Sequence, residues 1–444
     1  MTSLSYIHQE SSQCLQSELD LFLVPPTSTQ VEKSACISYQ PVSSLSDTNV
    51  VEFFVAGTGE EYIDLSKTKL YVRARIRNAN GSALTEEQSK LVAPVNNWLH
   101  SLFSQLDVFL NDRLVSTSNN LYAYRAYLET LLNHGEDAEK SQLTCSLFYR
   151  DKAGKMELTG DDNKGWKVRN KFTAASTAVD MIGTPFVDIF NQARYLVNNV
   201  NMKLRLLRHS PDFSLMVDAT STLNYQIVIE QATLYVHKVK VSPTSLLSHA
   251  TIMQTTPVKY PINRVEMKSF SLSQGDMGAS RDNIVLGQMP KRVVLGIVSG
   301  SAVNGNPKKN PFNFDNFNLN YLALHIDSEQ IPATALTPDY GNSQYIREYQ
   351  SIFDGLGLWK TDKGIPINRE DYPNGYALYA FDLTPTQAGS GTSSCFNLLR
   401  QGNLKLEMKF KEPLAEVINV ILHLTYENML EIDGARNVVY DYST

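Results

Sequence analysis

The sequence of 444 residues contains few cysteines, and none of them is paired at the spacing of a metal or redox site. No CxxC motif occurs, and the four cysteines lie far apart, at Cys14, Cys36, Cys145 and Cys395. This usage excludes the disulfide framework of a small secreted protein. We therefore predict free thiols in a protein of a reducing compartment.

Long apolar runs and basic tails are also missing. No stretch approaches the ~18 consecutive apolar residues of a transmembrane helix, so we expect no membrane span. No basic segment followed by an apolar run stands at the start, so we expect no signal peptide. The net charge is −6, and the first 23 residues contain neither Lys nor Arg. Because proteins that wrap nucleic acid usually carry a basic stripe or arm, we expect no direct nucleic-acid binding.

The usual catalytic and metal-binding patterns are absent too. The 8 histidines form no HxH, HxxxH or HExxH pattern, whereas a metal ion needs three or four converging ligands. His237, His325 and His423 fall inside predicted strands, where a partly buried polar side chain is the simpler interpretation. The sequence also contains no GxSxG, GxxxxGK[ST] or GxGxxG motif. We therefore expect no enzyme, no cofactor and no metal ion.

Alternating apolar and polar residues dominate the sequence from residue 51 onward. The segment KTKLYVRARIRNANG, residues 67–81, shows the pattern most clearly. Its apolar face would consist of Leu70, Val72, Ala74 and Ile76, and its other face would carry Arg73, Arg75 and Arg77. A period of two residues indicates a half-buried strand, and an Asn-Gly pair, here Asn80-Gly81, is typical of a hairpin turn.

Several segments occur twice, in the same order, in the two halves of the sequence. NMKLRLLRH at 201–209 matches NLKLEMKFK at 403–411, and LDVFLNDRLV at 106–115 matches LALHIDSEQI at 322–331. We also match VEFFVAG, which ends at Gly57, with MKSFSLSQG, which ends at Gly275. A predicted helix, capped by Asn119 or Asn120 and ending before Gly135, has its counterpart in GNSQYIREYQSIFDG. The shared order indicates a divergent duplication.

Each half contains about eight short strands with turn signals, which is typical of a jelly roll. The predicted fold class is therefore all-β, a tandem (double) jelly roll of two eight-stranded antiparallel β-sandwiches with a few short helices in the loops. We predict an extended N-terminal arm over residues 1–50, a first roll over 51–245 and a second roll over 246–444. The linker would lie at about 241–263, and polar insertions at roughly 133–185 and 355–397 would project from the ends of the sandwiches.

The three arginines of the strand at 67–81 are the sharpest charge feature. Like charges on one strand face repel each other unless a nearby acidic group neutralises them. We therefore name Arg73, Arg75 and Arg77 as a candidate subunit interface, facing an acidic neighbour in the other roll or in another subunit. A solvated face is the simpler alternative, and a nucleic-acid face ranks third. In the duplicated strand, Arg205 corresponds to Glu407, so the two copies differ in the sign of one charge.

Three segments resemble a known family: SELDLFLVPPTSTQVEKS, VAPVNNWLHSLFSQLDVFLNDRLVS and NLYAYRAYLETLLNHGEDAEKSQLTCSLFYRD. They are similar to major capsid proteins of Polinton/Maverick elements and adintoviruses, which are double jelly rolls. The resemblance implies a homotrimer of pseudo-hexameric outline that tiles an icosahedral viral shell, with the N-terminal arm at its base. It further implies minor capsid or penton proteins as partners. The location would be the virion capsid, after synthesis in the host cytoplasm and assembly in the host nucleus.

Two other functions stay open at this point. A spike or attachment protein that binds glycans would expose aromatic residues on its loops, and Trp166 and Trp359 lie in the two insertions. A double jelly-roll hydrolase would need converging acids or a histidine cluster, which the sequence does not indicate.

Overall fold

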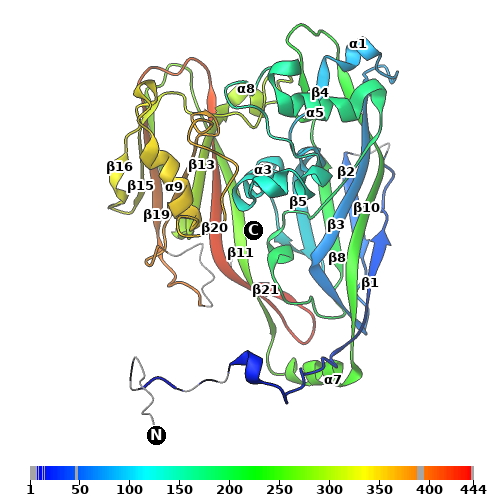
Figure 1. Cartoon of the computed structure of the whole chain (residues 1–444). Helices are drawn as coiled ribbons and strands as arrows, with labels where there is room; N and C mark the ends of the chain where they lie inside the picture. The colour runs from blue at the N-terminus through cyan, green and yellow to red at the C-terminus, as the bar shows by residue number, and fades with distance from the viewer. Residues whose placement is uncertain are drawn as a thin grey trace.

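The computed structural model describes residues 8, 10–12, 14, 16–45, 49–387 and 395–441. It is an all-β tandem jelly roll with a few short helices, as the sequence predicted (Figure 1). The strands up to residue 241 are β1 (Val31–Tyr39), β2 (Val50–Val55), β3 (Glu61–Asn78), β4 (Val92–Pro94), β5 (Phe103–Leu110), β6 (Arg113–Ser116), β7 (Val179–Gly183), β8 (Met202–Arg208), β9 (Leu215–Val217) and β10 (Tyr225–Val241). The later strands are β11 (Val258–Leu272), β12 (Gly278–Gln288), β13 (Arg292–Ser299), β14 (Phe314–Asp315), β15 (Leu319–Ile326), β16 (Glu329–Leu336), β17 (Asn374–Gly375), β18 (Leu378–Asp382), β19 (Gln401–Phe410), β20 (Ile418–Ile432) and β21 (Val438–Tyr440).

The helices lie between the strands and at the ends of the sandwiches. The α-helices are α1 (Glu86–Ser89), α2 (Trp98–Ser101), α3 (Tyr122–Asn133), α4 (Glu136–Glu139), α5 (Lys164–Thr173), α6 (Pro211–Ser214), α7 (Pro243–Ile252), α8 (Gly300–Val303) and α9 (Ile346–Leu356). The 3-10 helices are η1 (Ser17–Leu19), η2 (Gln142–Ser146), η3 (Gly160–Asp162), η4 (Ala174–Ser176), η5 (Asp188–Asn191) and η6 (Tyr340–Asn342). The predicted cap of α3 is wrong: the N-cap is Leu121, because Asn119 and Asn120 form a left-handed turn just before it.

Both rolls have the same strand order. In the first roll the sheets are β1-β10-β3-β7 and β2-β8-β5-β6, and in the second they are β11-β20-β13-β18 and β12-β19-β15-β16. Every paired strand in these sheets is antiparallel. The two orders correspond position by position, as expected of a duplicated jelly roll.

Most of the repeated segments occupy equivalent places. β8 and β19 hold the same sheet position, as do the hairpins β5–β6 and β15–β16, and α3 and α9 each follow those hairpins. One match was wrong: VEFFVAG is β2, whose counterpart is β12, whereas MKSFSLSQG belongs to β11, the counterpart of β1. Both segments are short alternating strands followed by a turn, and such a local pattern does not say in which sheet a strand pairs.

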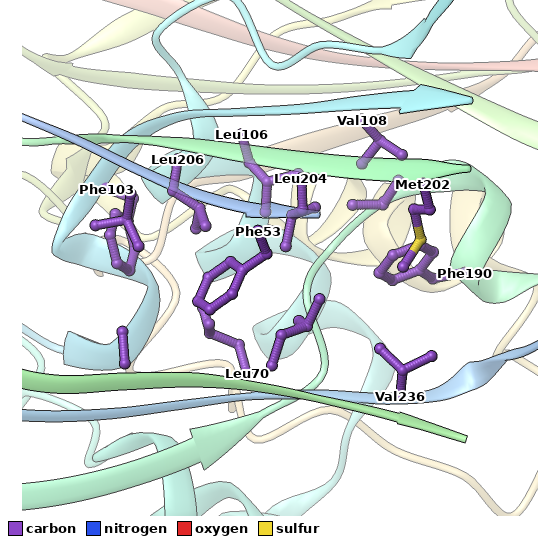
Figure 2. Close-up of a cluster of buried hydrophobic side chains, with 14 of the residues drawn as sticks. Phe53, Leu70, Phe103, Leu106, Val108, Phe190, Met202, Leu204, Leu206 and Val236 are labelled. Carbon is purple, nitrogen blue, oxygen red and sulfur yellow. The ribbon is translucent and has the colours of Figure 1, made fainter. Parts of the chain in front are cut away.

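The first core fills the space between the two sheets of the first roll. Figure 2 shows Phe53, Leu204 and Leu206 of one sheet pointing toward Leu70 and Val236 of the other. The predicted inner face of β3 is confirmed, since its members are all fully buried: Leu70, Val72, Ala74 and Ile76. A second such core, which includes Leu406 and Leu424, fills the second roll. Burial of one face of each strand is what holds the sandwiches together.

The range 1–50, predicted as an extended arm, includes one strand of the first sandwich. Val31–Tyr39 forms β1, which pairs with β10 from Val31↔Val241 to Tyr39↔Leu234, so this part of the range belongs to the first sandwich. Residues 16–30, which precede β1, run beneath the body, next to α7 at its lower end (Figure 1).

The two rolls share strands. β11 begins in the first core with Tyr260 and Ile262 and ends in the second core with Leu272. β20 begins in the second core and reaches the first with Leu430 and Ile432. The range 241–263, predicted as a linker, holds α7 and the start of β11. Two continuous strands therefore join the rolls. No helix of the described residues is long and apolar enough to cross a membrane.

Candidate functional site

The rolls meet where α3 of the first roll packs on the β11-β20-β13-β18 sheet of the second (Figure 1). α3 contributes Tyr124, Tyr127 and Leu131 to a core cluster that also contains Val294 and Ile421 of that sheet. The ring of Tyr127 stacks on Phe312 of the second roll, with 4.3 Å between the ring centroids. We call this contact region the roll junction. Its apolar packing resembles a protein core, which favours a fixed arrangement of the rolls.

A buried ion cluster lies in the roll junction. The Arg125 guanidinium on α3 donates to Oε1 of Glu129 at 2.8 Å and to Oδ1 of Asp188 at 2.6 Å. The same Asp188 oxygen accepts the backbone N–H of Val265 in β11, at 3.0 Å. Arg125 and Asp188 are 1% and 3% exposed. Because a buried charge is costly unless it is paired and hydrogen-bonded, this cluster ties α3 to the second roll in one geometry.

His423 of β20 completes this cluster from the second roll. Its Nε2 lies 3.6 Å from Oε1 of Glu129. Burial alone would raise the pKa of Glu129, but Arg125 and His423 lower it to about 2. Burial lowers the pKa of His423, despite the opposing effect of Glu129. Glu129 therefore stays ionised beside Arg125, while burial favours a neutral His423.

A second buried cluster joins the insertion after α3 to the second roll. Arg169 of α5 donates to Oδ1 of Asp151 at 2.7 Å, and Asn310 donates to Oδ2 of the same carboxylate at 2.9 Å. The hydroxyl of Tyr376 donates to the Asp151 carbonyl at 2.6 Å. Asn310 and Tyr376 belong to the second roll, so Asp151 serves both rolls. The residues 133–185, predicted only as a projecting polar insertion, thus also hold the rolls together.

The predicted arginine face lies on β3, on the side away from the first core. Arg73 and Arg75 both form ion pairs with Glu230 of β10, the neighbouring strand, and the Arg73–Glu230 distance is 3.2 Å. Arg77 donates to the Gly81 carbonyl at 3.4 Å, and within the described residues it has no carboxylate partner. The acidic neighbour of two of the arginines is therefore in the same sheet. The charge of Arg77 is therefore not neutralised by a carboxylate among the described residues, and the Arg77 side chain is partly exposed.

The charge difference between the duplicated strands is present, and each charge has a partner. Arg205 of β8 donates to Oδ2 of the buried Asp107 at 2.8 Å. Glu407 of β19 lies 3.5 Å from Nε2 of His325 and 3.3 Å from Nζ of Lys409. The two polar faces are thus built from different ion pairs around equivalent positions.

The sequence predictions for metal ligands and for the two insertion tryptophans can be compared with the structure. No three His, Cys, Asp or Glu side chains of the described residues come together in a way that could hold a metal ion. Of the two insertion tryptophans, Trp166 is 2% exposed and donates to the Met216 carbonyl, whereas Trp359 is 62% exposed. The junction residues were not singled out from the sequence. The only signal was a charged pair, Arg125 and Glu129, four residues apart on an otherwise apolar helix face.

No protein-family model matches the chain. An uncharacterized protein of Caenorhabditis elegans, F54H12.2, is 24% identical over 431 residues, which cover 94% of this chain and 99% of that protein. Among solved structures, a chain of the Sputnik virophage, seen by cryo-EM, has a TM-score of 0.66 and 12% identity, covering 98% of this chain and 94% of its own.

Two further solved structures have the same fold. A chain of the PBCV-1 virus capsid has a TM-score of 0.57 and 11% identity, over 95% of this chain and all of its own. The Faustovirus major capsid protein has a TM-score of 0.56 and 9% identity, over 93% of each chain. At these identities the likeness concerns the fold: a double jelly roll of the kind found in viral major capsid proteins, over nearly the whole chain.

Proposed function

We propose that the protein is a major capsid protein, a structural subunit of an icosahedral viral shell, and not an enzyme. The observation that carries this proposal is the likeness over the whole chain, both rolls included, to the chains of the Sputnik virophage and the PBCV-1 capsid. The rigid roll junction supports it, because a shell subunit must present the same edges in every copy.

The proposed assembly is a homotrimer of pseudo-hexameric outline. Two equivalent rolls in each of three subunits give six similar lobes, which lets a threefold assembly tile a hexagonal lattice. The strand orders of the two rolls support this, since equivalent sheets present similar edges. Arg73, Arg75 and Arg77 remain the candidate subunit interface. Arg77 is the strongest of the three, because its charge has no acidic partner in the described chain.

The proposed setting is a Polinton/Maverick or adintovirus-like element. The relative in a nematode supports this, because a similar chain in an animal fits an element carried by an animal genome. The subunit would be made in the host cytoplasm and assemble in the host nucleus into a virion capsid. Minor capsid or penton proteins would be further partners, and the acidic chain would not contact nucleic acid directly.

The mass of the purified protein in solution, combined with negative-stain imaging, tests this proposal. Analytical ultracentrifugation should give the mass of a trimer, and images should show compact particles of pseudo-sixfold outline. A protein that remains a monomer over a wide range of salt and protein concentration would refute the proposed assembly.

A glycan-binding attachment protein is the second candidate, and Trp359 favours it. This exposed tryptophan lines a groove of about 1030 Å³ next to α9, together with Arg347 and Asp382. Exposed aromatic rings are common in sugar sites, because they offer a flat apolar face with a polar edge. Binding of the purified protein to a glycan array, lost in Trp359→Ala, would support this candidate. No binding to any glycan would remove it.

A further inference from the structure

The N-terminal arm carries an apolar segment whose large side chains are mostly exposed in the described part of the chain. In Leu19–Val24, which we call the arm segment, the exposed fractions are 61% for Leu19, 75% for Leu21, 92% for Phe22, 74% for Leu23 and 86% for Val24. An apolar run that is so fully exposed marks an interaction site. It therefore requires a partner.

The arm segment lies beneath the body of its own chain, outside the two sandwiches (Figure 1). Pro25 and Pro26 follow it directly, and proline fixes its own φ and holds the preceding residue extended. The chain consequently leaves β1 in an extended, stiff conformation and runs beneath the body (Figure 1). A return of the segment onto its own roll would need a reversal within residues 25–30, a stretch that begins with these two prolines.

A cavity at the lower end of the same molecule is lined by apolar side chains, like those of the arm segment. It has a volume of about 450 Å³ and lies between the root of the arm, α7 and the start of β11. We call it the base groove, and its apolar lining includes Val31, Tyr62, Tyr195, Ile252, Val258 and Tyr260. Ile252 on α7 is 57% exposed, and Leu247 on the same helix is 71% exposed. The base groove is thus an open apolar surface beside an exposed apolar helix.

The charges of the arm segment and of the base groove are complementary. Glu18 and Asp20 lie in or next to the arm segment, and residues 1–32 contain no Lys or Arg. Arg194 lines the base groove and donates to the Lys259 carbonyl. Arg436, beside the adjoining residue Met253, donates to Asn198. In the described part of the chain neither arginine forms an ion pair, so both could pair with the carboxylates of a docked segment.

We propose that the arm segment of one copy docks in the base groove of a neighbouring copy of this chain. The inference rests on the proposed self-association, but not on a trimer or a shell. The acidic arm does not suit an anionic membrane surface, which attracts Lys and Arg. The stiff Pro25-Pro26 step disfavours docking in the groove of the same copy. A second copy offers both the apolar surface and the two arginines.

Disulfide trapping between two distinguishable copies tests this exchange. One copy carries Leu23→Cys and a size tag, and the other carries Ile252→Cys. Both are full-length chains, co-expressed in a background where serine replaces the exposed cysteines Cys14, Cys36, Cys145 and Cys395. We expect a covalent dimer of tagged and untagged chains after mild oxidation. In the matched control, Phe172→Cys replaces Ile252→Cys, at a 45% exposed position on α5 at the opposite end of the molecule.

The outcomes separate this inference from the proposed function. A mixed dimer well above the Phe172→Cys control supports arm exchange, even where no shell forms. Shells without a mixed dimer would leave the capsid role standing and overturn the exchange.

A second comparison uses Phe22→Ser and Phe172→Ser in the chain with its natural cysteines. Self-association measured by ultracentrifugation should weaken at least tenfold in Phe22→Ser and stay unchanged in Phe172→Ser. Equal association of both variants would contradict the exchange. Flotation of the wild-type chain, but not of Phe22→Ser, with phosphatidylcholine vesicles in the absence of a mixed dimer would also overturn it and assign the arm to lipid.

Discussion

Arg125 and Asp188 form an ion pair in the roll junction, with 2.6 Å between Nη2 and Oδ1 and with neither side chain more than 3% exposed. The same carboxylate oxygen holds the backbone of Val265. One aspartate therefore pairs with a charge of the first roll and accepts a hydrogen bond from a strand of the second. The pair links the packing of α3 to the placement of the other roll.

Asp188→Asn should lower the free energy of unfolding strongly. Glu129 still pairs with Arg125 in this variant, but the carboxylate that accepts from both Arg125 and the Val265 N–H is lost. Loss of hydrogen bonds that involve a buried charged group typically costs about 1.5–3 kcal/mol. Urea unfolding, followed by tryptophan fluorescence, measures this loss. Glu136→Gln is the matched control, because its 3.0 Å pair with Lys140 is exposed on both sides, and exposed pairs contribute little to stability. A loss in Asp188→Asn no larger than that of the control would contradict the assigned role.

Acidification below pH 6.5 should destabilise the protein through its buried histidines. Burial lowers the pKa of His100 from 6.5 to about 3, and its Nδ1 lies 2.9 Å from the Tyr122 hydroxyl. Between these two values the unfolded chain binds a proton that the folded chain does not, so stability falls as the pH falls. One such group contributes a slope of at most about 1.4 kcal/mol per pH unit.

His100→Asn should flatten this pH dependence. Urea midpoints measured from pH 7 to pH 4 should change less in the variant than in the wild type, although the variant is less stable at pH 7. His8→Asn, in the exposed arm, serves as the control and should keep the wild-type slope. Parallel curves for His100→Asn and the wild type would show that His100 does not cause the effect.

Leu204→Ala and Leu406→Ala should each destabilise the whole chain. These residues hold equivalent positions on β8 and β19, and both are almost completely buried. Truncation of a core leucine typically costs about 2–5 kcal/mol. Because β11 and β20 enter both cores, we expect one unfolding transition, which both variants shift. Two transitions in calorimetry, each shifted by only one variant, would mean that the rolls unfold independently.

Arg77→Glu should impair self-association without a large loss of stability. The Arg77 side chain has no carboxylate partner in the described chain, so its reversal breaks no internal ion pair. Ultracentrifugation measures association, and urea unfolding measures stability. Unchanged association would mean that the arginine face is a solvated surface and not a subunit interface.

A charge swap, Arg75→Glu with Glu230→Arg, should separate folding from association in the same face. It preserves an ion pair between positions 75 and 230, removes the partly exposed pair of Arg73 with Glu230, and inverts the local charges. If the arginine face contacts another subunit, this double variant should fold normally and associate less. A double variant that associates like the wild type would argue against that contact.

Much of the fold could be predicted because a strand with one buried face has a visible period. Leu70, Val72, Ala74 and Ile76 were placed correctly for this reason. The pairing of strands is not local information, which is why VEFFVAG was matched with the wrong segment. Likewise, β1 was assigned to the arm, because its exposed residues lack the clear alternation of an inner strand.

The candidate site was less predictable, because its charges come together from distant parts of the chain. Asp188 lies 63 residues after Arg125, and no spacing in the sequence predicts that these two residues form a pair. The sequence suggested an acidic neighbour for Arg73 and Arg75 in the other roll or another subunit. The register of β3 and β10 instead places Glu230 beside them, and that register cannot be read from either strand alone.

The continuous strands β11 and β20 have a mechanical consequence. A flexible linker would let the two rolls change their mutual angle, but two hydrogen-bonded strands that are embedded in both cores resist bending. The two rolls of one chain are thus expected to keep a fixed mutual angle, and the proposed shell subunit would be a rigid plate. Any closed surface built from such plates must gain its curvature at the seams between subunits.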